Sequence, residues 1–356
     1  MKNEILNDLG EFKIINEIVL PAFEKNKSLL PLGDDCAYLS LPNYPDLLVV
    51  TSDPAPKPLV WNLGYESYWV WGWYSVLINV SDIASAGAKP ICFTSSVEAP
   101  SDMKVEDFKD FFSGLSAACN QFNIPNAGGN IRAAPRFECH GTAIGVVENK
   151  NILTRRDCKL DDIIIVIGES GRFISAYLQA KMNGFSSLSQ INKDSLTRPI
   201  AKLREMMILK ELNIVHASSD NSDGILGSLW NIVERSNCAI EIDMNRQLIP
   251  KEILELASIL NLNPWNLMLF WGDWQVVITI PNEQLDKFQS ITKKENIIYS
   301  VLGRAIKSEP AIYGVVGTEK KRLKILRNEN FITSSYNVNI GEHVDYMLKT
   351  SLFDNE

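Results

Sequence analysis

The 356-residue sequence has few of the side chains on which zinc and redox sites depend. It contains only three histidines, His140, His216 and His343, and its six cysteines form no Cys-x-x-Cys pair. Zinc sites need three or four such ligands at suitable spacing, so a zinc hydrolase is not expected. The histidines are better interpreted as structural residues, and the cysteines as reduced, mostly buried thiols.

Long apolar runs and an excess of basic residues are also missing. No stretch reaches the roughly 18 apolar residues of a membrane-spanning helix, and the charged N-terminal segment contains no signal-peptide core. The net charge is −8, with 35 Lys and Arg against 43 Asp and Glu. Nucleic-acid binding normally needs a basic face that neutralises phosphates. We therefore expect a cytoplasmic protein without nucleic-acid or membrane partners.

The common phosphate-binding motifs are absent as well. No Gly-Lys dipeptide occurs, which excludes a Walker A loop, and the His-Arg-Asp and Asp-Phe-Gly motifs of protein kinases are missing. An acidic protein can still bind a nucleotide when metal ions bridge its carboxylates to the phosphates. Any nucleotide chemistry must therefore depend on acidic side chains.

Hydrophobic periodicity predicts a mixed α and β chain. Its length is about twice that of a typical domain, and we place the boundary near residue 150, giving domains at 1–150 and 151–356. Residues 127–130, Ala-Gly-Gly-Asn, are interpreted as a glycine turn. Apolar spacing predicts helices at 5–27, 65–87 and 104–122, and strands at 46–53 and 139–147.

The predicted helix at 65–87 carries an unusual number of aromatic residues but no Lys or Arg. Base-stacking surfaces interleave aromatic with basic side chains. These aromatic residues are therefore expected to pack in the core or at a subunit interface. They are Tyr68, Trp69, Trp71, Trp73 and Tyr74.

Acidic and hydroxyl side chains cluster where apolar runs end. Hard oxygen ligands from several elements are what a Mg²⁺ site requires. Each cluster alone is typical of a turn or helix cap, and Ser222 or Asp223 could cap a helix at 224–236. A calcium loop is excluded because its twelfth position holds Trp230 instead of Glu. The clusters are Gly33-Asp34-Asp35, Thr51-Ser52-Asp53, Ser81-Asp82 and Asp220-Asn221-Ser222-Asp223-Gly224.

The order of these clusters resembles thiamine-monophosphate kinase, in the superfamily of aminoimidazole ribonucleotide synthetase and selenophosphate synthetase. Eight ordered segments carry the resemblance, and INVSDIASAGAKP is the most specific. The others are GEFKII, GDDCAYL, VVTSD, NAGGN, LTR, RPIAKL and DNSDGIL.

The resemblance implies an ATP- and Mg²⁺-dependent kinase that phosphorylates thiamine phosphate or a related small phosphorylated metabolite. It also implies an α/β (α+β) fold, with an N-terminal, mostly antiparallel sheet that pairs in a homodimer and a C-terminal α/β sandwich. Phosphoryl transfer depends mainly on positioning and charge neutralisation, so we expect direct in-line transfer without a phosphoenzyme intermediate.

The resemblance assigns roles to individual residues. Asp53, Asp223 and Arg155 are implied to be catalytic. Arg155, Ser222, Gly129 and Asn130 are implied to contact ATP. The implied Mg²⁺ ligands are Asp35, Thr51, Ser52, Asp53, Asp82, Asp220 and Asp223.

Three departures from the family pattern fall mainly on the acceptor side. Asn130 replaces an Asp in the family's Gly-Gly-Asp-Thr-Thr. Gly272 replaces the family's substrate-contacting Glu, whereas the Asp that follows this Glu is kept as Asp273. Trp61 stands near the sequence position at which the family has a substrate-side His. Trp61 and Asp273 are therefore the candidate substrate residues. Two other hypotheses stay open: an ATP-dependent amidoligase or cycloligase that activates a carbonyl, and a non-catalytic nucleotide-binding paralogue.

Overall fold

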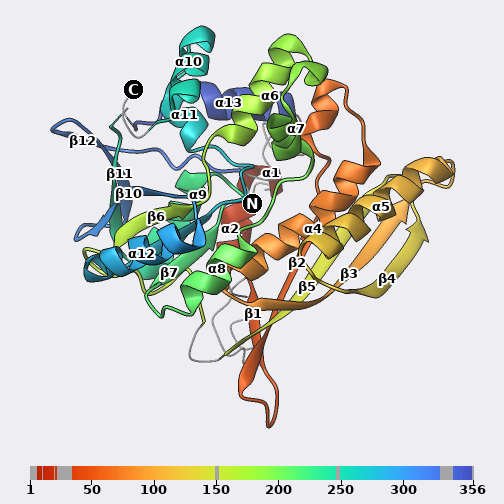
Figure 1. Cartoon of the computed structure of the whole chain (residues 1–356), viewed down its shortest axis with the longest axis horizontal. Helices are drawn as coiled ribbons and strands as arrows, with labels where there is room; N and C mark the ends of the chain where they lie inside the picture. Colours follow the sequence, from red (N-terminus) through yellow and green to blue (C-terminus); the bar gives the residue numbers. More distant parts are fainter. Residues whose placement is uncertain are drawn as a thin grey trace, which may run out of the picture.

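Two β-sheets with helices packed on them form the body of the computed structural model (Figure 1). Among the described residues, no helix combines the length and the apolar character needed to cross a membrane. The described residues are 6–9, 11–19, 21, 34–148, 152–245, 249–328 and 340–354.

The N-terminal sheet has the strand order β1-β2-β5-β3-β4. Every pair is antiparallel except β3 with β4, which confirms the mostly antiparallel sheet. Alternate residues of β2 are buried because only one face packs against helices. The strands are β1 (Ala37–Ser40), β2 (Asp46–Pro54), β3 (Lys89–Ala99), β4 (Asn126–Ala133) and β5 (Glu138–Glu148).

The predicted glycine turn at 127–130 is wrong, because these residues belong to the edge strand β4. Gly129 pairs with Ser95 of β3. A Cβ at Gly129 would overlap the Ser95 carbonyl oxygen. This glycine therefore permits a close approach of two strands.

Helices α4 (Tyr68–Ser85) and α5 (Val105–Gln121) cover one face of this sheet and confirm the helices predicted there (Figure 1). The two helices cross closely at a pair of glycines. A Cβ at Gly72 would overlap the Phe111 carbonyl oxygen, and one at Gly114 would overlap that of Trp69. Close backbone packing thus requires both glycines.

The aromatic residues of α4 join the two halves of the chain. The indole N–H of Trp73 donates to the Pro199 carbonyl at 2.9 Å, and the Tyr74 hydroxyl to that of Leu196 at 3.1 Å. Trp71, Trp73 and Tyr74 are buried. The prediction of aromatic packing in the core is confirmed, and α4 is held between the N-terminal sheet and the C-terminal part.

The C-terminal sheet has the order β12-β11-β8-β10-β6-β9-β7, antiparallel except for β11 with β8. Its strands are β6 (Ile163–Ile167), β7 (Ala217–Asp220), β8 (Ala239–Asp243), β9 (Val276–Ile280), β10 (Tyr299–Ile306), β11 (Ala311–Val316) and β12 (Glu319–Arg322).

Helices cover both faces of this sheet, which confirms the α/β sandwich. On β6, Ile164 and Val166 pack in the same core as α9 (Ile225–Ser236). Ile165 and Ile167 face the other way, toward α8 (Leu203–Lys210) and α12 (Leu285–Glu295). Because both faces are buried, β6 is apolar throughout.

The remaining helices lie mostly beyond one end of the C-terminal sheet, at the top of Figure 1. They are α6 (Arg172–Asn183), α7 (Gln190–Thr197), α10 (Lys251–Leu260), α11 (Pro264–Met268) and α13 (Ile340–Lys349), and the short 3-10 helices are η2 (Leu59–Leu63), η4 (Phe185–Ser187) and η6 (Asn282–Gln284).

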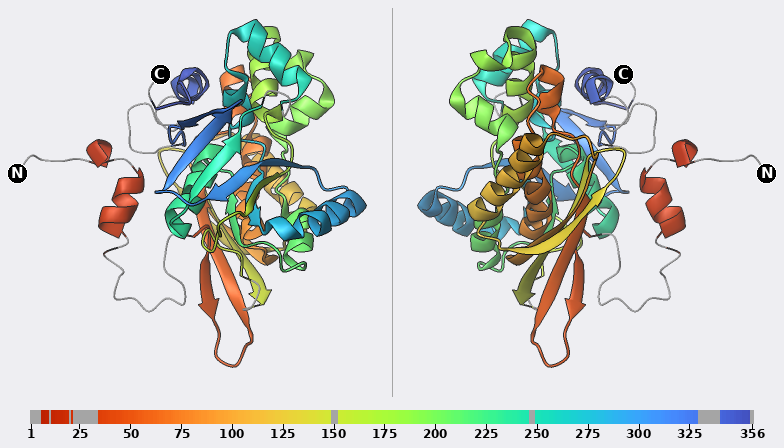
Figure 2. Two further views of the ribbon diagram at one scale, coloured as in Figure 1. Left: turned by 90° about the vertical axis from the view of Figure 1, so that its left-hand side faces the viewer. Right: turned by 90° about the vertical axis from the view of Figure 1, so that its right-hand side faces the viewer.

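The helix predicted at 5–27 is divided where the structure describes it. It consists of α1 (Leu6–Leu9), α2 (Glu11–Ile14) and a π-helical turn, η1 (Ile15–Val19). These pieces lie to one side of the two sheets (Figure 2). The positions 5, 10, 20 and 22–27 of the prediction lie outside the described residues.

Candidate functional site

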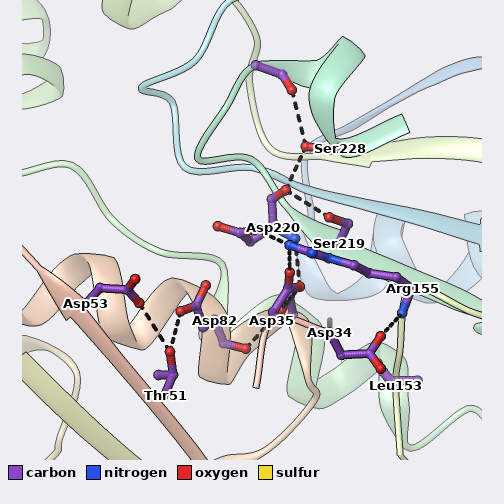
Figure 3. A network of polar contacts seen from close by, with 12 residues as sticks. Asp34, Asp35, Thr51, Asp53, Asp82, Leu153, Arg155, Ser219, Asp220 and Ser228 are labelled. Atoms are coloured by element: carbon purple, nitrogen blue, oxygen red, sulfur yellow. Dashed lines mark hydrogen bonds and ion pairs between the residues drawn. The ribbon is translucent and has the colours of Figure 1, made fainter. Parts of the chain in front are cut away.

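Acidic side chains from both halves of the chain meet beside α4 (Figure 3). Asp35 precedes β1, Asp53 lies in β2 and Asp82 in α4, whereas Asp220 ends β7 of the C-terminal sheet. The structure thus brings together residues nearly 200 positions apart. The polar clusters at the ends of apolar runs converge on one place.

Short hydrogen bonds fix the N-terminal members of this cluster. The Thr51 hydroxyl lies 2.6 Å from Asp82 Oδ2 and 3.2 Å from Asp53 Oδ2. Ser85 donates to Asp35 Oδ2 at 2.6 Å. Because Ser85 lies one turn after Asp82 on the same helix, Asp35 is held against α4 next to the Asp82 carboxylate.

Arg155 provides the cationic side of the cluster. It forms an ion pair with Asp35, and its Nη2 lies 3.9 Å from Asp220 Oδ1. The backbone N–H of Asp220 also donates to Asp35 Oδ2 at 3.2 Å. Next to Arg155, Arg156 Nη1 lies 3.1 Å from Asp34 Oδ2. Two successive arginines therefore hold two successive aspartates.

The cluster carries more negative than positive charge. Burial raises the pKa of Asp82, and Asp53, Asp220 and Asp35 raise it further. Burial and Asp35 likewise raise the pKa of Asp220, against the opposing effect of Arg155. Carboxylates crowded in this way favour an additional cation.

The described residues do not form a complete protein cage for a metal ion. In the part of the chain that the structure describes, no three His, Cys, Asp or Glu side chains lie close enough to hold an ion by themselves. Magnesium does not need such a cage, because it usually takes one or two carboxylates with water and substrate phosphates. The crowded carboxylates fit a Mg²⁺ ion that arrives with a phosphate ligand.

The Asp220–Gly224 loop connects β7 to α9 and is held at several points. Ser228 donates to the Asp220 carbonyl at 2.6 Å. Asn221 is buried, and its amide donates to Gln275 Oε1 at 2.6 Å. The N-cap of α9 is Gly224, so neither Ser222 nor Asp223 caps this helix. Asp223 lies close enough to raise the pKa of Asp220.

Three residues assigned by resemblance lie elsewhere within the chain. Ser52 lies on the opposite face of β2 from Thr51 and Asp53, and its hydroxyl is 2.9 Å from Thr142 Oγ1. Gly129 and Asn130 are exposed on β4, which β5 and β3 separate from β2. None of these side chains joins the carboxylate cluster.

Asp273 has a structural partner of its own. Its two carboxylate oxygens accept from the backbone N–H groups of Gly171 and Phe173, at 2.6 and 2.7 Å. It therefore holds the start of α6. Burial raises its pKa to about 6, despite these hydrogen bonds and nearby Lys202. A Cβ at the adjacent Gly272 would collide with the Phe173 ring, so this packing demands glycine.

Trp61 is partly buried and belongs to a group of aromatic side chains. Its ring makes edge contacts with Tyr68 and Trp71 at centroid distances of 5.2 and 5.6 Å. Lys57 Nζ lies 4.3 Å from the ring centroid. These contacts are separate from the hydrogen bonds that hold the carboxylate cluster.

Sequence reasoning missed several residues that support the cluster. Asn79 is buried in α4 and accepts from the Asp53 backbone N–H at 3.2 Å. It follows Ser75 by four positions, and its amide donates to the Ser75 carbonyl at 3.0 Å. Polar residues such as Asn79 and Ser85 on an otherwise apolar helix were the available signal.

The fold and the site define the class of protein. The chain belongs to the AIR synthase related protein family, whose N-terminal domain model matches residues 33–147 and whose C-terminal domain model matches residues 159–314.

Within this family the chain is similar to thiamine-monophosphate kinases. That of Buchnera aphidicola from Schizaphis graminum is 26% identical over 321 residues, covering 88% of this chain and 96% of the relative. That of Methanocaldococcus jannaschii is 29% identical over 320 residues, covering 86% and 96%. The solved structure of AaThiL complexed with AMPPCP and TMP has a TM-score of 0.74 at 22% identity, covering 90% of this chain and 99% of that one. This last likeness shows the shared fold.

Proposed function

We propose that this protein is an ATP- and Mg²⁺-dependent phosphotransferase whose acceptor is thiamine monophosphate or a closely related phosphorylated metabolite. The observation that carries the proposal is the meeting of Asp35, Asp82 and Asp220 with Arg155. Phosphoryl transfer needs such a combination of metal-binding carboxylates and a fixed guanidinium. The similar curated kinases, and a structural relative that holds AMPPCP and TMP, support the same activity.

Asp35, Asp53, Asp82 and Asp220 would hold Mg²⁺ ions, one or two carboxylates to each ion, together with the nucleotide phosphates. When bound, Mg²⁺-ATP supplies the transferable phosphoryl group and the charge that these carboxylates lack. Asp223, at the start of α9, is proposed as a further ligand. The Thr51 hydroxyl lies between Asp53 and Asp82 and within hydrogen-bond distance of both carboxylates, so their oxygens are already in place before binding.

Arg155 is proposed to contact the phosphates. Burial alone would lower the pKa of its guanidinium, but Asp35, Asp220 and Asp82 raise it, so Arg155 stays charged. Its side chain is 20% exposed. A planar guanidinium can bind two phosphate oxygens at once.

A homodimer is proposed through the N-terminal sheet. The face of this sheet opposite α4 carries half-exposed apolar residues, including Leu48, Val50, Ile144 and Val146. The edge strand β4 is exposed throughout, and its Ile131 is 61% exposed. A second copy of the sheet would cover these apolar groups. In that assembly Gly129 and Asn130 of one copy would lie at or near the interface, where the resemblance places ATP.

The function is tested by ADP release in the presence of Mg²⁺, ATP and thiamine monophosphate. Asp53→Asn and Asp223→Asn each remove one charge from the cluster and are expected to reduce turnover at least about 100-fold. Asp46→Asn is the matched control, because Asp46 lies at the other end of the same strand β2. Near-normal turnover in both site variants would contradict the metal assignment.

A further inference from the structure

The Asp220–Gly224 loop is held from outside by a residue near the C-terminus. Asn328 makes two hydrogen bonds to this loop: its side-chain amide donates to the Ser222 carbonyl at 2.8 Å, and its backbone N–H to the Asp223 carbonyl at 3.2 Å. These contacts join two successive peptide groups of the loop to one residue. They fix the backbone that carries the Asp223 carboxylate.

A buried histidine orients Asn328. His343 Nε2 lies 2.7 Å from Asn328 Oδ1, and His343 is only 2% exposed. An amide oxygen can only accept, so His343 Nε2 carries the hydrogen. This bond selects the orientation of the Asn328 amide in which the NH₂ group points toward Ser222. A chain of contacts therefore runs from helix α13, through Asn328, to the loop.

Helix α13 is itself fastened to the body of the protein. Asn266 of α11 donates to the carbonyls of Met347 and Thr350, at 2.8 and 3.0 Å. Asn266 is buried, and so are Val344, Met347 and Leu348 of α13. Because α13 is anchored independently, His343 can act as a fixed point for Asn328.

Asn328 and His343 lie beyond residue 314, where the match to the C-terminal domain model ends. The loop that they hold lies within the matched region. Gly224, at the end of the loop, has a φ of +93°, a conformation that glycine adopts readily.

We propose that Asn328 and His343 are positioning residues that set the place of Ser222 and Asp223 in the nucleotide site. The inference rests on the proposed function, in which Asp223 binds Mg²⁺ together with ATP. A displacement of about 1 Å in a catalytic group can reduce a rate by about 100-fold. Loss of the two hydrogen bonds from Asn328 to the loop would affect binding and turnover of Mg²⁺-ATP by displacing the loop. In the described contacts, neither the Asn328 nor the His343 side chain reaches the carboxylate cluster itself.

The test combines hydrogen exchange with kinetics in the full-length protein. Asn328→Ala removes the bond to Ser222, and His343→Phe removes the donor but fills the buried space. We expect amide exchange of the loop peptide to rise about tenfold in both variants, with β2 peptides unchanged. The KM for Mg²⁺-ATP is expected to rise and kcat to fall. His343→Gln restores a donor to Asn328, so its loop exchange and its KM are expected to remain within about threefold of the wild-type values.

Asn266→Ala is the matched control, because it removes two hydrogen bonds to α13 without touching the loop, while the buried Val344, Met347 and Leu348 keep the helix and His343 in place. It is expected to lower the midpoint of urea unfolding while leaving loop exchange and KM near the wild-type values. The proposal is overturned if Asn328→Ala leaves loop exchange unchanged, or if Asn266→Ala changes it equally. It is also overturned if His343→Gln behaves like His343→Phe. A wild type without turnover, but with loop exchange that depends on Asn328, would refute the proposed function and not the contact.

Discussion

Replacing Arg155 by methionine tests the charge balance of the carboxylate cluster. Asp35, whose side chain is 5% exposed, would then lose its ion pair, and Asp220 its nearest guanidinium. Removing one partner of a buried ion pair typically costs about 3–5 kcal/mol. We expect a loss of that size in the free energy of unfolding when Mg²⁺ is absent, measured by urea denaturation.

Magnesium should offset part of this loss. Without the guanidinium, the carboxylates around Asp35 need another cation, and a ligand present at 100 times its Kd stabilises a protein by about 2.7 kcal/mol. We therefore expect Mg²⁺ to stabilise Arg155→Met more than the wild type. Arg156→Met is the matched control, because Arg156 is 21% exposed and pairs with Asp34 next to Asp35.

Two outcomes would refute this reasoning. The first is an Arg155→Met protein as stable as the wild type without Mg²⁺, which would mean that the guanidinium does not compensate the cluster. The second is an equal gain from Mg²⁺ in Arg155→Met and Arg156→Met, which would mean that the ion does not bind beside Asp35.

Three further predictions concern the fold and its pH dependence. The pKa of Asp273 rises from 3.8 to about 6 on folding. Its contribution to the free energy of unfolding is therefore fully present below about pH 4 and falls by about 3 kcal/mol as the pH rises past 6. Urea unfolding of Asp273→Asn should lack this pH dependence, and an unchanged pH dependence would contradict the assignment. Gly114→Ala should destabilise the α4–α5 crossing by at least about 1–3 kcal/mol, and a wild-type unfolding midpoint would show that the helices can separate freely. Val50→Asp, on the proposed dimer face, should give a monomer in light scattering, whereas an unchanged mass would exclude this face.

The chemistry of the site could be predicted from the sequence, but its geometry could not. Asp35, Asp53, Asp82 and Asp220 follow apolar runs, and this pattern predicted oxygen ligands from several elements. Their meeting depends on α4 packing between the two halves of the chain, through contacts such as that between Trp73 and Pro199. Such long-range packing leaves no local signal in the sequence.

Errors arose where residue type was ambiguous. Ser52 was grouped with Thr51 and Asp53 but points to the opposite face of the strand, and its role as a Mg²⁺ ligand stays a prediction. Gly129 was interpreted as part of a turn, whereas it allows β4 to approach β3. The ATP contacts of Gly129 and Asn130 stay predictions, as does the boundary at residue 150. Asn328 and His343 gave no recognisable pattern, because their contact depends on where α13 packs.

The central claim is the transfer of a phosphoryl group to a phosphorylated acceptor, and product identification tests it most directly. Purified protein would be incubated with Mg²⁺-ATP and thiamine monophosphate, and the products identified by mass spectrometry. We expect thiamine diphosphate and ADP in equal amounts, with neither formed by Asp53→Asn. ATP binding without thiamine diphosphate would contradict thiamine monophosphate as the acceptor, and absence of ATP binding would contradict the phosphotransferase itself.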